Sequence, residues 1–102
     1  IACATVGTGD PLVVRAEDVL ANSLNVYASA MSFHFASSTT ESPATYKAFE
    51  SFRTSFPLVW HGLDYAKRQY QRDKINGKAP LEAALNALTT LVGTVQSLIG
   101  RV

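Results

Sequence analysis

Cysteine is almost absent from this chain of 102 residues, which contains only Cys3. A single cysteine cannot form an internal disulfide, and it excludes zinc sites built from several cysteines and iron–sulfur cluster motifs. Glycine and proline are also scarce, with six and four residues, whereas four tyrosines, five phenylalanines and one tryptophan can fill a core. This composition excludes a disordered chain and a collagen-like repeat.

An excess of either charge is lacking too. Nine lysines and arginines face eight aspartates and glutamates, which gives a formal net charge of +1. So balanced a chain creates no strong electrostatic field, and nucleic acid is therefore not an expected partner. The length suits one compact domain. We expect a flexible N-terminal lead over residues 1–9, which are small or polar, and a single helical bundle domain over residues 10–102.

The first helix is predicted from Pro11 to Ser37. Asp10-Pro11 is typical of a helix start, since the carboxylate accepts from free amides of the first turn and proline fits the first helical position. Apolar residues then recur at intervals of three and four, as a buried helix face requires, at Val13, Ala16, Leu20, Leu24, Tyr27, Met31 and His34. The hydroxyl-rich run from Ser37 to Ser42 ends this period.

The second helix is predicted from Pro43 to about Ile75, after another capping residue and proline at Ser42-Pro43. Its apolar positions again alternate intervals of three and four, at Phe49, Phe52, Phe56, Val59, Leu63, Ala66 and Tyr70. Pro57 interrupts the segment, and a proline inside a helix costs roughly 3 kcal/mol. Because the apolar phase continues across Pro57, we favour one helix kinked there. Two separate helices, and hence a four-helix chain, remain the alternative.

The third helix is predicted to begin at Ala79-Pro80, after Asn76-Gly77, a pair that commonly ends helices. Its apolar residues are Leu81, Leu85, Leu88, Val92, Val95, Ile99 and Val102. Short connections make neighbouring helices antiparallel, so the predicted fold is an all-α, up-down-up bundle of three long helices. We expect the end of the second helix, from Tyr70 to Lys74, to project or to be covered by a partner. The predicted core comprises Leu20, Leu24, Tyr27, Phe49, Phe52, Phe56, Leu63, Leu85, Leu88, Val92 and Val95.

Residues suited to catalysis or metal binding are few. His34 lies on the apolar face of the first predicted helix, whereas His61 lies outside the apolar face of the second. Neither has a Cys, Asp or Glu at a ligand spacing. Gly7-Thr8-Gly9 begins like a dinucleotide-binding loop, but Leu12 stands where that loop needs its third glycine. No serine lies on the sharp, glycine-flanked turn that exposes a nucleophile. We therefore predict no enzyme activity, no cofactor and no metal site.

The segment from 67 to 78 has a charge bias, because Asp73 is its sole acid and its basic residues are Lys67, Arg68, Arg72, Lys74 and Lys78. Basic side chains near a helix C-terminus are favoured by the helix dipole, so a solvated helix end is one interpretation. Contact with an anionic surface, with lipid headgroups ahead of nucleic acid, is the other.

Residues 83–100 contain no charge, and their 18 positions approach the lower limit for a membrane span. Polar residues such as Asn86, Thr90 and Gln96 lie off the apolar stripe, which favours packing in a bundle instead. Gly93 and Gly100 either mark a line of close approach to another helix or are simply tolerated.

Trp60-His61-Gly62 resembles the Trp-x-Gly motif of the WXG100 family of small secreted helical proteins. In that family the motif occupies the turn of a two-helix hairpin. Here it falls within a periodic helix of a chain with two connections, and the departure counts against membership.

Ile1-Ala2-Cys3 resembles the end of a bacterial lipoprotein signal, although a processed lipoprotein begins at its cysteine and two residues precede Cys3 here. Asp10-Pro11-Leu12-Val13-Val14-Arg15-Ala16-Glu17 and Leu24-Asn25-Val26-Tyr27 resemble small helical proteins of bacteria and their phages, many with a lipoprotein-type leader. The resemblance implies a periplasmic, membrane-tethered location in the bacterial cell envelope, with Cys3 as the lipidation candidate, or else a virion-associated one.

Two functions are therefore expected. The first is a non-enzymatic structural or interaction protein of the envelope, which contacts the membrane through Cys3 and the basic residues 67–78. The second is a subunit of a larger assembly, such as a phage virion, tail or secretion apparatus, because the apolar faces of the first and third helices exceed a minimal helix seam. A protein partner or self-assembly is expected in either case.

Overall fold

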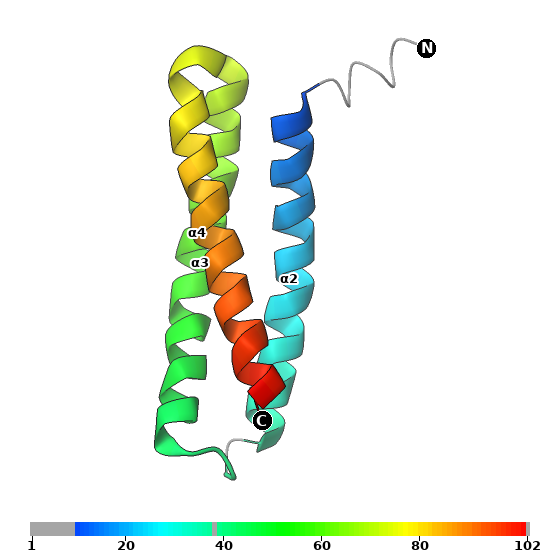
Figure 1. Cartoon of the computed structure of the whole chain (residues 1–102), viewed down its shortest axis with the longest axis vertical. Helices are drawn as coiled ribbons and strands as arrows, with labels where there is room; N and C mark the ends of the chain where they lie inside the picture. Colours follow the sequence, from blue (N-terminus) through cyan, green and yellow to red (C-terminus); the bar gives the residue numbers. More distant parts are fainter. Residues whose placement is uncertain (1–9, 38, 102) are drawn as a thin grey trace, which may run out of the picture.

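The computed structural model describes residues 10–37 and 39–101, and three long helices make up nearly all of this range. They are α2 (Pro11–Ser37), α3 (Pro43–Arg72) and α4 (Lys74–Arg101). Figure 1 shows each helix antiparallel to the one before it, so the predicted all-α, up-down-up bundle is confirmed. Cys3 and the flexible lead expected over residues 1–9 lie outside the described residues.

The two predicted capping residues begin the first two helices. The Asp10 carboxylate accepts from the Leu12 amide at 2.9 Å at the start of α2. The Ser42 hydroxyl accepts from the Thr45 amide at 3.2 Å at the start of α3. Each cap satisfies an amide that has no partner within its own helix, which is why these helices begin where the sequence indicates.

Helix α3 runs without a break through Pro57. The single-helix interpretation is confirmed, and the four-helix alternative is wrong. Phe56 and Leu63, on either side of the proline, are 3% and 0% exposed, so both halves bury the same apolar face. That burial offsets the hydrogen bond that Pro57 cannot donate to the Arg53 carbonyl.

The predicted connection between the second and third helices is wrong. Asp73 alone separates α3 from α4, so Asn76, Gly77 and Pro80 all lie within α4. The Asp73 carboxylate accepts from the backbone amide of Asn76 at 3.1 Å and from its side-chain amide at 2.7 Å. This cap starts a new helix before the Asn-Gly pair can end the old one.

Gly77 has a different function from the predicted helix stop. A Cβ atom added to it would lie 2.6 Å from the Tyr70 Cα, so only glycine allows α4 to cross α3 this closely. The close crossing leaves Tyr70 only 7% exposed. Tyr70 is therefore covered by α4, so the expected projection is wrong for Tyr70, whereas residues 71–74 beyond it are exposed.

Most of the predicted core is buried where all three helices meet. Of the eleven predicted residues, Leu24 is wrong, because it is 48% exposed, and Tyr27 and Val92 are partly buried against the core. Ser23, which is 2% exposed, occupies the buried position next to Leu24, and its hydroxyl donates to the Leu20 carbonyl at 3.0 Å. That local hydrogen bond removes the cost of burying a hydroxyl.

Candidate functional site

The basic residues of the 67–78 segment are divided between two helices, with Lys67, Arg68 and Arg72 on α3 and Lys74 and Lys78 on α4. Figure 1 shows that the turn joining α3 to α4 lies at the same end of the bundle as the start of α2. This arrangement brings acidic residues of α2 to the basic ones.

Asp10 is the first of these acidic residues. Its carboxylate lies 2.8 Å from the Lys74 ammonium and accepts from the Tyr70 hydroxyl at 2.9 Å. The hydrogen bond from Lys74, supported by Tyr70 and two backbone amides, lowers the pKa of Asp10 to about 2. Asp10 thus joins the start of α2 to both other helices.

Asp64 and Glu17 neutralise part of the positive charge of Lys67 and Arg68. Arg68 lies 3.0 Å from Asp64, and Lys67 lies 3.5 Å from Glu17 and 3.8 Å from Asp64. Arg72 and Lys78 form no ion pair within the described part of the chain. The segment is therefore a mixed network of both charges, a weaker contact for anionic lipids than five unpaired cations.

Sequence reasoning missed these acidic partners for two reasons. Glu17 and Asp10 are fifty or more positions from the lysines they meet, so only the fold reveals them. Asp64 lies just before the basic segment, four residues from Arg68, and the i,i+4 spacing was sufficient to predict that pair.

A second polar cluster, the histidine cluster, consists of His34, Glu41 and Glu50. His34 Nδ1 lies 2.8 Å from Glu41 Oε1, and Nε2 lies 2.7 Å from Glu50 Oε2. His34 is 1% exposed and the Glu41 side chain is fully buried, whereas Glu50 is 28% exposed and lies 2.8 Å from Arg53. Hydrogen bonds from Arg53 and then His34 lower the pKa of Glu50. The cluster ties the end of α2 to the turn and to α3.

The histidine cluster was not expected, because Glu41 and Glu50 are seven and sixteen positions from His34. The signal that sequence did contain was a histidine on an apolar stripe, which requires polar partners if it is buried. The imidazole lies between the two carboxylates, so the three side chains do not converge on one point. Within residues 10–37 and 39–101 no group of three His, Cys, Asp or Glu side chains is arranged to hold a metal ion.

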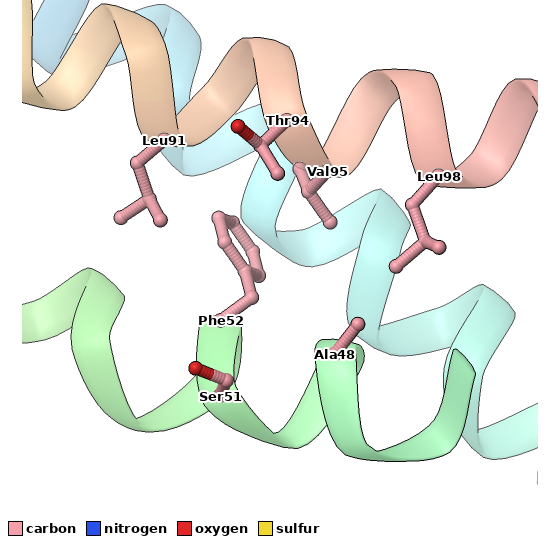
Figure 2. Close-up of a pocket in the computed structure, with 7 residues that line it drawn as sticks. All are labelled: Ala48, Ser51, Phe52, Leu91, Thr94, Val95 and Leu98. Carbon is pink, nitrogen blue, oxygen red and sulfur yellow. The ribbon is translucent and has the colours of Figure 1, made fainter. Parts of the chain in front are cut away.

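The seams between the helices contain hollows lined by uncharged side chains. Figure 2 shows one of about 190 Å³ between α3 and α4, into which Phe52 points from α3 towards Leu91 and Val95 of α4. A hollow of about 330 Å³ lies between α2 and α3, lined by Leu24, Tyr27, Phe56, Pro57, Trp60 and His61.

The third hollow, the α2–α4 groove, has a volume of about 300 Å³, and its lining includes Val19, Asn22, Val26, Thr89, Gly93 and Gln96. Gly93 has open space above it, since an added Cβ would meet nothing within 4 Å. Gly100 is equally open, so neither glycine marks a close approach within the chain.

Both helices that form the α2–α4 groove lack charge over long stretches. Residues 19–37 of α2 and 83–100 of α4 contain no Asp, Glu, Lys or Arg. In the described chain, α4 is long and apolar enough to cross a membrane by length and composition, and most of its apolar window is not buried in the bundle. These two stretches extend to the end of the bundle opposite the basic residues of the 67–78 segment (Figure 1).

Trp60, His61 and Gly62 lie in the middle of α3, and the Trp60 indole donates to the Leu20 carbonyl of α2 at 2.9 Å. This position differs from the interhelix turn that the motif occupies in WXG100 proteins. Comparisons of the chain with protein-family models, with curated proteins and with solved structures give no match.

Proposed function

We propose that this protein is a non-enzymatic interaction subunit of a larger assembly, and that its α2–α4 groove receives an apolar helix of a protein partner. The groove supports the proposal most directly, because it is an open seam between two helices whose facing halves carry no charge. A bacterial envelope or a phage virion is the proposed setting, from the resemblance of its first helix.

The groove suits a helix for three physical reasons. No charged group must be stripped of water when a partner covers it, which avoids the largest cost of burial. Gly93 leaves room for close approach of another backbone. Asn22 and Gln96 provide amides that can hydrogen-bond to the edge of the incoming helix. A fourth helix here would complete a bundle that three helices leave open.

Gly93→Glu tests the groove, because it places a charge in the seam at a position where an added Cβ meets nothing within 4 Å. Gly62→Glu is the matched control, since Gly62 is also a helical glycine with nothing within 4 Å of an added Cβ. Each variant is expressed in the native source with a photo-crosslinking residue at position 96, and crosslinked partners are identified by mass spectrometry. We expect the Gly93→Glu variant to lose a partner that wild type and Gly62→Glu retain.

Equal helix content by circular dichroism must accompany that result. Crosslinks that are identical in all three chains would exclude the groove as the docking site. Insertion of purified wild-type protein into lipid vesicles, with position 96 crosslinked to acyl chains, would instead make α4 a membrane segment and also overturn the proposal.

A second candidate function is an envelope protein tethered through a lipid on Cys3, with the basic residues on an anionic membrane. The observation that favours it is that the start of α2 and the α3–α4 turn share one end of the bundle. Mass spectrometry of the native protein tests acylation of Cys3. Arg72→Gln with Lys78→Gln, the two cations without an acidic partner in the described chain, should reduce binding to anionic liposomes at low salt.

A further inference from the structure

The exposed side of α3 carries a regular series of charges, which we name the α3 stripe. Its residues recur at intervals of three and four and so lie on one face of the helix, at Glu50, Arg53, Pro57, His61, Asp64 and Arg68. From one end to the other the stripe is therefore acidic, basic, uncharged in the middle, acidic and basic.

This order is complementary to itself when reversed. If a second α3 lies antiparallel over the first with the midpoint level with Val59, Glu50 of each copy faces Arg68 of the other. In the same register Arg53 of each copy faces Asp64 of the other, and Pro57 faces His61. Each end of the stripe therefore meets opposite charge, and no like charges of the stripe face each other.

The charged ends are already arranged for this contact within one chain. Arg53 lies 2.8 Å from Glu50, and Arg68 lies 3.0 Å from Asp64. Each pair is accessible, since the arginines are 44% and 69% exposed. Pairing two stripes would extend each two-residue contact into a four-residue network, the arrangement in which exposed ion pairs contribute most.

The middle of the stripe is apolar and hollowed. Leu24 of α2, which lies across the seam from Pro57 and His61, is 48% exposed. The hollow of about 330 Å³ between them is lined by aromatic side chains, and the Trp60 indole N–H is already bonded to Leu20. A buried apolar centre with a charged rim is the usual anatomy of a specific interface.

The area of the contact is sufficient for a weak dimer. From Glu50 to Arg68 α3 is about 27 Å long, and α2 and α3 together present a face about 20 Å wide, at about 10 Å for each helix. Two such faces bury roughly 1,000 Å² in total, which is the lower bound for a specific interface. Micromolar association is therefore expected.

We propose that two copies of this chain associate through their α3 stripes, antiparallel and about a two-fold axis level with Val59. A membrane or an unrelated protein fits the surface less well, because neither provides the reversed order of the same charges. The α2–α4 groove remains free in such a dimer, so this proposal and the proposed function can fail independently.

Sedimentation velocity of the whole chain tests the dimer at concentrations from about 5 to about 500 µM, across the range expected for micromolar affinity. Leu24→Glu places a charge from each copy at the apolar centre of the contact, and Arg68→Glu places Glu opposite Glu50 of the other copy. Leu24 and Arg68 are 48% and 69% exposed, so the fold of one chain is retained. We expect each change to weaken association at least tenfold, roughly the effect of one misplaced interface charge.

Ile75→Glu and Arg15→Glu are the matched controls. Ile75 is 90% exposed on α4, and Arg15 lies on the side of α2 opposite Leu24, because nine residues turn a helix by half a revolution. The controls make the same chemical changes away from the stripe and should associate as wild type does. A wild-type chain that stays monomeric at about 500 µM in low salt, or controls that weaken as much as the two test variants, would overturn the proposal.

Discussion

Replacing His34 by Phe should strongly destabilise the fold, although phenylalanine fits the same space. The imidazole stacks on Phe49 with centroids 5.1 Å apart and planes at 22°, and a phenyl ring can make that contact. The change removes two short hydrogen bonds to carboxylates and leaves the fully buried Glu41 without its strongest partner. Removing one partner of a buried pair costs about 3–5 kcal/mol.

A second substitution separates loss of the pair from loss of packing. His34→Phe with Glu41→Met replaces the buried polar pair by apolar groups, which is often close to neutral. Ser37 loses a weak bond to Glu41 at 3.3 Å but still donates to the Phe33 carbonyl at 2.7 Å, so no hydroxyl is left without a partner. Glu50 retains Arg53. The double variant should therefore recover to within about 1.5 kcal/mol of wild type.

Urea denaturation and thermal melts, both followed by circular dichroism at neutral pH, measure both changes. For a domain of this size, each kcal/mol corresponds to a shift in melting temperature of about 4–8 °C, so the single variant should melt at least about 12 °C lower. A single variant within about 1 kcal/mol of wild type, or a double variant no more stable than the single one, would refute the assignment of the cluster as a buried hydrogen-bonded tie.

Three further predictions concern stability. Gly77→Ala should destabilise the fold by about 1–3 kcal/mol, because its Cβ would lie 2.6 Å from the α3 backbone. Gly93→Ala, in open space, should instead stabilise the fold by about 1 kcal/mol, and thermal melts of the two variants show whether the signs differ. Phe52→Ala should cost about 3–5 kcal/mol, since Phe52 is 4% exposed, and an unchanged melting temperature would contradict the core assignment. Folding lowers the pKa of Asp10 from 3.8 to about 2, so the stability that the Asp10 carboxylate contributes is present above pH 3.8 and is lost as the pH falls through 2. The difference in unfolding free energy between wild type and Asp10→Asn should therefore shrink as the pH falls across that window.

The helices were predictable where a local signal and the tertiary fold agree. Asp10 and Ser42 cap the helices that they precede, and the apolar phase across Pro57 correctly predicted one continuous α3. Asn76-Gly77 misled because two local signals competed. The Asp73 cap, three residues earlier, starts α4 first, and Gly77 is then needed for close packing and not for a left-handed turn.

The polar sites were less predictable, because their partners are distant in sequence. No spacing rule connects Asp10 to Tyr70 and Lys74, or His34 to Glu50. Leu24 illustrates the same limit in the core. Either Leu24 or Ser23 can lie on the buried face of α2, and only the position of α3 decides which of the two is buried.

The one-residue link at Asp73 has a consequence for the order of folding. Two helices joined so closely form contacts between residues near each other in the chain, which cost little loop-closure entropy. The pair α3–α4 also makes the most extensive contacts in the molecule. We therefore expect this helical hairpin to form the folding nucleus and α2 to dock afterwards. Amide hydrogens of α2 should then exchange through a lower-energy opening than those of α3 and α4, which would make α2 the helix that a partner can displace.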